Sequence, residues 1–167
     1  MIRIAGLNGN DMVNGEGISV SLFLQGCPFH CEGCHNPETW NPNRGIAVDE
    51  EDLIQQILLL LNANNVCRNL SILGGEPLAT KEKVNFLAWL IQIVKDFYPS
   101  IKIVLWTGYT YEKLKIIDNQ DLQYILDNIN YLIDGPFKIE ERDITLKWRG
   151  SRNRRIINMK TGEIENN

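Results

Sequence analysis

Three of the four cysteines fall within eight residues, at Cys27, Cys31 and Cys34, and are called the motif cysteines below. Their spacing is C-x3-C-x2-C, and both histidines of the chain, His30 and His35, lie in or directly beside this segment. Thiolates at this density can surround one cubane cluster, because soft sulfur ligands suit iron–sulfur sites. A common cubane has four cysteine ligands. The segment therefore predicts a [4Fe-4S] cluster with one iron open to another ligand.

Two other interpretations use the same cysteines. A structural zinc site would combine the three thiolates with His30 or His35 in a Cys3His set. However, His35 directly follows Cys34, and neighbouring residues rarely bind one metal. A conventional four-cysteine cluster would add Cys67 and make the protein an electron carrier. Cys67 lies between a predicted helix and a predicted strand, where a lone cysteine is more often a small packed residue.

Glycine-rich turns follow several of the predicted strands. Gly74 and Gly75 end a short apolar strand, where glycine lets the backbone adopt positive φ and approach a ligand closely. The carboxylate of Glu76 is suited to a cofactor ammonium, although a solvated carboxylate at a helix start has the same sequence pattern. Turns at residues 107–109 and 134–135 should open on the same edge if the strands are parallel.

Strands and helices alternate along most of the chain. Strands are expected at residues 19–25, 70–73, 101–106 and 129–134, and helices at residues 49–61, 81–97, 111–117 and 121–128. This order predicts βα units, whose ligands bind beyond the carboxyl ends of the strands. With about four or five units, the chain is too short for an eight-fold barrel. We expect an α/β fold: a single-domain partial (βα) barrel over residues 1–167, with a mostly parallel sheet and the cluster loop after an early strand.

Composition narrows the choice of partners. A chain of 167 residues that is 44% hydrophobic can bury one core. Its formal net charge of −4 gives no global reason to expect nucleic acid or a membrane surface as partner. The N-terminus lacks the apolar core of a signal peptide, and no apolar run reaches about 18 residues. We therefore expect a cytoplasmic protein with no nucleic acid and no membrane partner.

The C-terminal segment is locally basic. Residues 138–160 hold eight Lys or Arg against three acids. This surplus suits an acidic partner or, through one arginine, a cofactor carboxylate, and it suits a solvated charged face equally well.

The motif C-x3-C-x2-C resembles the signature of the radical S-adenosylmethionine enzymes. Within that superfamily the chain looks like the activating proteins of anaerobic (class III) ribonucleotide reductase. The segments that carry this resemblance are residues 14–17, 23–28, 34–40, 74–78, 106–109, 134–137 and 148–155. They extend over nearly the entire chain.

The resemblance implies cofactors, ligands and a partner. The motif cysteines would hold a [4Fe-4S] cluster whose free iron chelates S-adenosylmethionine. A low-potential electron donor would supply the electron that cleaves it to methionine and a 5′-deoxyadenosyl radical. That radical would take a hydrogen atom from a backbone glycine of anaerobic ribonucleotide reductase, the protein substrate, and no catalytic side chain is required. The implied cofactor-binding residues are Gly33, Cys34, His35, Gly74, Gly75 and Glu76.

One position departs from the wider superfamily. The residue before the third cysteine is often aromatic there and stacks near the adenine, whereas this chain has Gly33. His35 offers a ring nearby instead. Two rival radical enzymes, a glycyl radical activase for a lyase and a deazapurine-forming synthase, share the same cysteine motif.

Overall fold

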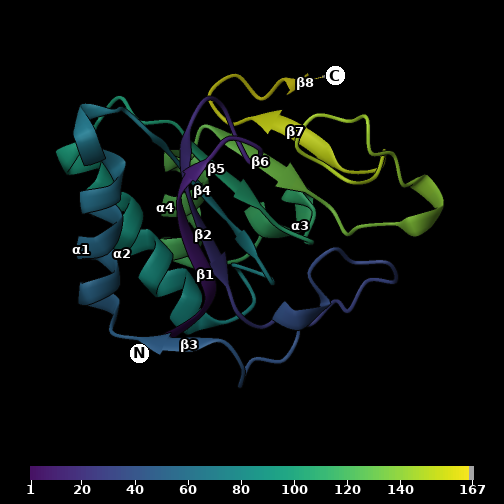
Figure 1. Ribbon diagram of the computed structural model, residues 1–167. Coiled ribbons are helices and arrows are strands. Elements are labelled where there is room, and N and C mark those ends of the chain that lie inside the picture. Colours follow the sequence, from purple (N-terminus) through teal and green to yellow (C-terminus); the bar gives the residue numbers. More distant parts are fainter. Residues whose placement is uncertain (166–167) are drawn as a thin grey trace.

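An eight-stranded sheet forms the centre of the protein in a computed structural model, which describes residues 1–165 of the 167-residue chain (Figure 1). The strand order is β3-β1-β2-β4-β5-β6-β7-β8. The strands are β1 (Ile2–Asp11), β2 (Ser19–Leu24), β3 (Ile46–Val48), β4 (Asn69–Gly74), β5 (Ile103–Trp106), β6 (Tyr131–Asp134), β7 (Arg155–Asn158) and β8 (Ile164–Glu165).

The sheet is mixed. Strands β2, β4, β5 and β6 are parallel, whereas β3 and β1 on one side and β7 and β8 on the other pair antiparallel. The prediction of a mostly parallel sheet is therefore wrong, although the α/β class is confirmed. The reason is that β1 joins β2, and β7 joins β8, without a crossover helix, and such connections give antiparallel neighbours. This strand order does not establish the curvature of a partial barrel, which stays a prediction.

The four expected helices are confirmed, with boundaries that move by at most two residues. They are α1 (Glu50–Leu61), α2 (Lys81–Phe97), α3 (Tyr111–Lys115) and α4 (Gln120–Asn128), and three single 3-10 turns are η1 (Pro37–Thr39), η2 (Ala63–Asn65) and η3 (Ile139–Glu141). Side chains of Asp49, Thr80 and Asn119 accept backbone N–H groups at the starts of α1, α2 and α4. Among residues 1–165, no helix is long and apolar enough to cross a membrane.

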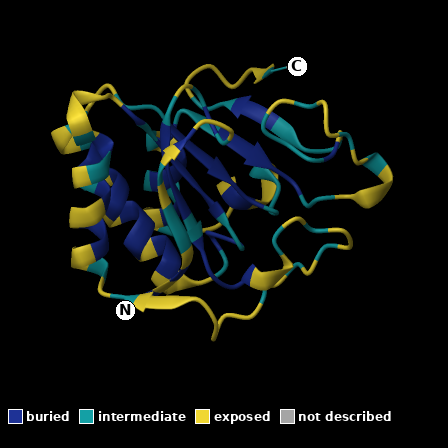
Figure 2. Cartoon of the chain, viewed as in Figure 1, coloured by how far each residue is buried: buried dark blue, intermediate teal, exposed yellow. Residues whose placement is uncertain are grey.

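The main core lies between the helices and one face of the sheet. Leu22, Ile72 and Leu105 point from the central strands toward Leu87 and Ile91 of α2, and all five are fully buried. Because side chains alternate along a strand, the neighbouring strand residues form a second, smaller cluster on the other face. That cluster contains Leu73, Val104, Trp106, Ile133 and Ile156. Figure 2 shows the buried residues concentrated in the strands and on the inner sides of the helices.

Candidate cluster and cofactor site

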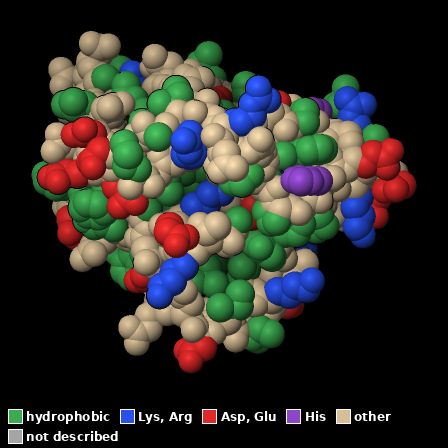
Figure 3. Space-filling view, turned by 90° about the horizontal axis from the view of Figure 1, so that it is seen from below, with side chains coloured by type: hydrophobic (Ala, Val, Ile, Leu, Met, Phe, Trp, Pro, Cys, Tyr) green, Lys and Arg blue, Asp and Glu red, His purple; other side chains and the backbone are tan. Residues whose placement is uncertain are grey.

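The motif cysteines lie in the loop that leaves the carboxyl end of β2. All three are half-buried, and all three line one open cavity of about 140 Å³, called the cysteine cavity below. Its other lining residues come from the ends of β4, β5 and β6, from the cysteine loop and from the segment before β7: Phe29, Asn36, Thr39, Trp40, Leu73, Gly74, Gly75, Glu76, Trp106, Thr107, Gly108, Gly135, Pro136, Phe137 and Arg154. The parallel strands thus bring the predicted turns to one edge. Figure 3 views the molecule from below, where hydrophobic side chains gather with Lys and Arg around them.

The three motif thiols are arranged around a space and do not converge on one point. Among residues 1–165, no group of three or more His, Cys, Asp or Glu side chains is placed to hold a metal ion. Each cysteine of a cubane binds a different iron, so its thiolates surround a space instead of meeting at one point. Three half-buried thiols around one cavity fit such a group. The backbone N–H of Asn36 also donates to Cys34 Sγ at 3.4 Å, a contact of the kind that tunes clusters.

Burial raises the pKa of the Cys27 thiol, whereas hydrogen bonds from the backbone N–H groups of Phe29 and His30 lower it. A metal binds the thiolate and not the thiol, so iron binding here releases a proton.

Cys67, the alternative fourth cluster ligand, and the histidines of the alternative zinc site lie outside the cysteine cavity. Cys67 is exposed and precedes the start of β4, whereas the cavity is at the end of that strand. Seven residues of extended chain separate Cys67 from Gly74, which is roughly 20 Å. His30 stacks on Trp40 with ring centroids 4.7 Å apart, and His35 faces Phe137 at 5.9 Å. Neither histidine lines the cysteine cavity.

The Gly74-Gly75 turn lies directly against the cysteine loop. Gly74 has φ +110°, and a Cβ there would be 2.4 Å from Leu24 N. A Cβ on Gly75 would be 2.4 Å from the carbonyl oxygen of Gly26, the residue before the first motif cysteine. Only glycine permits this close approach of two backbones. The two predicted glycines therefore do line the same cavity as the cysteines.

Glu76 is buried, and its carboxylate accepts hydrogen bonds from the turn after β4 and from the turn after β5. Its Oε1 accepts from Leu78 N at 3.0 Å and from Thr107 Oγ1 at 2.7 Å, and its Oε2 accepts from Gly108 N at 2.6 Å. Burial raises the pKa of this carboxyl group, while these hydrogen bonds lower it. Because an ionised carboxylate has about four acceptor positions, three protein donors leave little of it for a cofactor.

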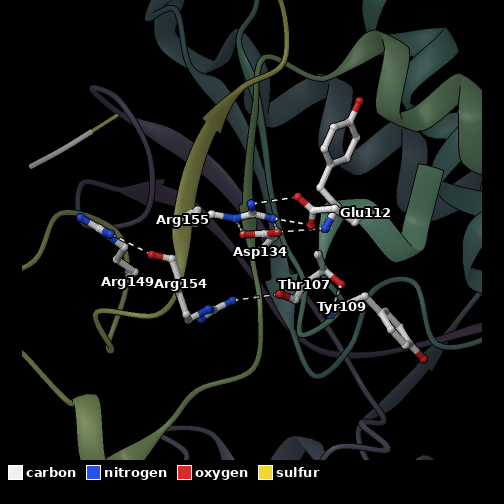
Figure 4. Close-up of polar contacts among 8 residues, drawn as sticks. Thr107, Tyr109, Glu112, Asp134, Arg149, Arg154 and Arg155 are labelled. Carbon is white, nitrogen blue, oxygen red and sulfur yellow. Dashed lines mark hydrogen bonds and ion pairs between the residues drawn. The ribbon is translucent and has the colours of Figure 1, made fainter. Parts of the chain in front are cut away.

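Arg154 places a cation in the cavity. Figure 4 shows it beside Thr107, whose carbonyl oxygen accepts from Arg154 Nη2 at 3.2 Å. Its buried Nε has no hydrogen-bond partner among the described residues. Burial lowers the pKa of the guanidinium, whereas the charges of Glu76 and then of Cys31 raise it. The basic segment was visible in the sequence, but nothing there distinguished Arg154 from its neighbours.

The next residue, Arg155, points the other way and joins three elements. It forms ion pairs with Asp134 at the end of β6 and with Glu112 in α3, the latter at 2.7 Å (Figure 4). Asp134 Oδ2 also accepts from Tyr111 N at 2.9 Å. This network is structural and holds the edge of the cavity in place.

Gly33 and His35 do not reach the cysteine cavity. A Cβ at Gly33 would be 2.6 Å from Ile139 Cδ1, so this glycine makes room for the segment after β6. Phe137 of the same segment contacts His35 and also lines the cavity. The contribution of Gly33 and His35 to cofactor binding therefore stays a prediction.

Comparisons with known proteins agree with this geometry. A family described as a 4Fe-4S single cluster domain matches residues 13–157, and the chain belongs to this class of protein. It is 38% identical over 147 residues to a protein of Pasteurella multocida, covering 87% of this chain and 90% of the relative. It is 34% identical over 151 residues to one of Escherichia coli K12, covering 90% and 94%. Another of phage T4 is 34% identical over 151 residues, covering 87% of each.

All three relatives are named anaerobic ribonucleoside-triphosphate reductase-activating protein. The chain belongs to this family, and the resemblance seen in its motifs is confirmed.

Proposed function

We propose that the chain is a radical S-adenosylmethionine activase that generates a glycyl radical on anaerobic ribonucleotide reductase. One observation carries this proposal: the motif cysteines of a reductase-activating family member line one cavity together with Gly74 and Gly75. The three relatives named above carry the reductase-activating name over most of their length, and this favours a reductase activase over the rival lyase activase and deazapurine synthase.

The bound groups supply the reaction. When bound, a reduced [4Fe-4S] cluster would supply one electron for the cleavage of S-adenosylmethionine, and the cleaved cofactor would supply the radical chemistry that removes one hydrogen atom from a reductase glycine. The protein holds the two groups, admits the glycine and excludes water. No side chain of the chain needs to act as acid, base or nucleophile.

Different residues of the cysteine cavity are assigned to the cluster and to the cofactor. The motif cysteines would hold three irons of the cluster. Gly74 and Gly75 let the methionine part of the cofactor lie against the backbone. Glu76 keeps the turn after β5 in position, and Gly33 and His35 stay candidates for contacts to the adenosine part.

Arg154 is the residue we assign to the cofactor carboxylate. Its guanidinium has five donors, and one of them is hydrogen-bonded to a neutral carbonyl. Among residues 1–165, no carboxylate lies within ion-pair distance of it. A half-buried cation of this kind favours an anionic ligand group.

The partners follow from the reaction. The reductase is the protein substrate, and its glycine must enter the cavity, which is open to solvent. A low-potential one-electron donor must also approach the cluster.

Electron paramagnetic resonance tests the proposal. Full-length protein, reconstituted anaerobically with iron and sulfide, is mixed with S-adenosylmethionine, dithionite and the reductase. A glycyl radical signal on the reductase is expected, with one 5′-deoxyadenosine formed per radical. The Cys31→Ser variant should give no signal, and Cys67→Ser should match the parent. If the parent protein binds the cluster and the cofactor but produces no glycyl radical, the proposal is wrong.

A further inference from the structure

A buried lysine, Lys83, joins the cysteine loop to the Gly74-Gly75 turn. It lies in the first turn of α2 and is 8% exposed. Its Nζ donates to the carbonyl oxygen of Gly26 at 2.9 Å and to that of Glu76 at 3.0 Å. Gly26 immediately precedes the first motif cysteine, and Glu76 immediately follows the glycine turn. One ammonium therefore contacts both loops that line the cysteine cavity.

The Gly26 carbonyl is the centre of this contact. It accepts the Glu76 backbone N–H at 2.9 Å in addition to Lys83 Nζ. Gly26 has φ +95°, and a Cβ on it would be 3.3 Å from Lys83 Nζ. The loop before Cys27 is thus held in a left-handed conformation directly beneath the ammonium.

The charge of Lys83 has no counter-charge in direct contact. Both acceptors are neutral carbonyls, and among residues 1–165 no carboxylate lies within ion-pair distance of its Nζ. A buried ammonium in such surroundings costs stability, and an apolar side chain of similar length would often serve the fold as well. Burial accordingly lowers the pKa of Lys83, while the charges of Glu76 and Cys27 raise it. The structure retains a costly cation beside the cysteine loop.

We propose that Lys83 is a positioning residue that holds the cysteine loop against the glycine turn and raises the reduction potential of the cluster. This inference rests on the proposed function, because it takes the motif cysteines as cluster ligands. A cubane held by three thiolates is anionic, and reduction adds one electron to it. A nearby fixed cation stabilises the reduced form more than the oxidised form. The electron comes from the low-potential donor, no bond forms at Lys83, and its ammonium keeps its protons.

Three substitutions separate the two roles of Lys83. Lys83→Met removes both the charge and the donors, Lys83→Gln keeps a donor without the charge, and Lys83→Arg keeps both. The matched control is Lys95→Met on the same helix, because Lys95 Nζ also donates to a backbone carbonyl, that of Asn128 at 3.3 Å. Lys95 is twelve residues further along α2, which is about 18 Å.

A potentiometric titration followed by electron paramagnetic resonance measures the effect on reconstituted full-length protein. We expect Lys83→Met and Lys83→Gln to shift the reduction equilibrium of the cluster toward the oxidised form by roughly tenfold, which is about 59 mV for one electron. Lys83→Arg and Lys95→Met should stay at the parent potential. Equal potentials for the parent, Lys83→Gln and Lys83→Met would show that Lys83 does not tune the cluster.

Hydrogen exchange tests the positioning role without any cluster. In the iron-free protein, Lys83→Met should speed exchange of the Glu76 amide, which donates to Gly26, and Lys95→Met should not. An unchanged exchange rate of the Glu76 amide in Lys83→Met would overturn the positioning role of Lys83. If Lys83→Met does not fold, Lys83→Gln decides the potential measurement, and Lys83→Leu, which also lacks the donors, replaces Lys83→Met in the exchange measurement. A parent protein that binds no iron would instead contradict the proposed function, so the two failures are distinguishable.

Discussion

Arg154 differs from the other cations of the basic segment in what its side chain contacts. Arg155 is neutralised by two carboxylates, whereas Arg154 lines the cysteine cavity with a neutral carbonyl as its acceptor. Arg154 directly precedes β7 and Arg155 begins it, and the two side chains point in different directions, Arg154 toward Thr107 and Arg155 toward Asp134 and Glu112 (Figure 4). At the scale of single residues, Arg155 therefore stabilises the fold, whereas Arg154 is available to a ligand in the cavity.

Replacing Arg154 should weaken cofactor binding. A hydrogen bond to a charged group contributes about 1.5–3 kcal/mol, so Arg154→Gln should raise the dissociation constant for S-adenosylmethionine by roughly ten- to hundredfold. Anaerobic equilibrium binding to the reconstituted protein measures this. Iron content should not change, because Arg154 does not hold the cluster. Parent-like affinity in this variant would remove Arg154 from the cofactor site.

Gly74 should tolerate no side chain. The Gly74→Ala substitution adds a Cβ 2.4 Å from Leu24 N at φ +110°, and strain with overpacking should lower the free energy of unfolding by roughly 2–5 kcal/mol. Gly6→Ala in β1 is the control, because a Cβ there meets nothing within 4 Å. It should change stability by less than about 1 kcal/mol. Urea unfolding of both variants gives the comparison, and equal losses would argue against the close approach at Gly74.

At the scale of elements, α3, β6 and β7 are joined through charged side chains and not through the main core alone. Arg155 of β7 contacts Asp134 of β6 and Glu112 of α3. Helix α3 has only five residues, and Leu114 is its buried residue. So short a helix has little stability of its own, and the contact with Arg155 fixes its position.

This connection predicts a pH dependence. The hydrogen bond from Arg155 lowers the pKa of Glu112 from 4.5 to about 2. Because the folded pKa lies below the unfolded one, ionised Glu112 stabilises the fold above about pH 5, and this contribution disappears as the pH falls toward 2. The side chain of Glu112 is 57% exposed, so the contribution at neutral pH should stay below about 1 kcal/mol.

Urea unfolding of the iron-free parent and of Glu112→Gln at several pH values measures the contribution of ionised Glu112 to the free energy of unfolding. The difference in free energy of unfolding should shrink between about pH 5 and pH 2.5. Glu163→Gln, at an exposed turn, should show no such trend. A difference independent of pH would mean that the carboxylate is not its source.

At the scale of the whole molecule, the cysteine loop lies outside the hydrophobic core, although Leu73 and Trp106 of the smaller cluster line the cavity. Neither hydrophobic cluster contains a residue between positions 25 and 45. That loop is instead closed by backbone hydrogen bonds, from Gly26 N to Thr39 O and from Cys27 N to Trp40 O. The sheet and helices can therefore fold before any cluster is inserted.

Removing iron should leave the fold intact. After chelation the far-ultraviolet circular dichroism and the cooperative unfolding transition should persist, because the core loses no contact. Hydrogen exchange should increase mainly at residues 27–36. Loss of cooperative unfolding on iron removal would show that the cluster holds the core together.

The local chemistry of the chain was predictable from sequence, because it depends on residues close to one another. The motif cysteines, the Gly74-Gly75 turn and the four helices follow from spacing and periodicity alone. The parallel arrangement of the central strands follows from the alternation of strands and helices. Cys34, Gly74, Gly75 and Glu76 line one cavity, and their contacts with a cofactor stay a prediction.

The antiparallel flanks and the cations were decided only by tertiary structure. Strand β1 contains Gly6, Gly9 and two asparagines, which disfavour strands, and its pairing with β2 has two irregularities. It is a strand because β2 and β3 flank it. Lys83 donates to Gly26, which lies 57 residues earlier in the sequence, and Arg154 lines the same cavity as Cys34, which lies 120 residues earlier. No local pattern encodes these placements, because they depend on the packing of α2 against the sheet and on the pairing of β7 with β6.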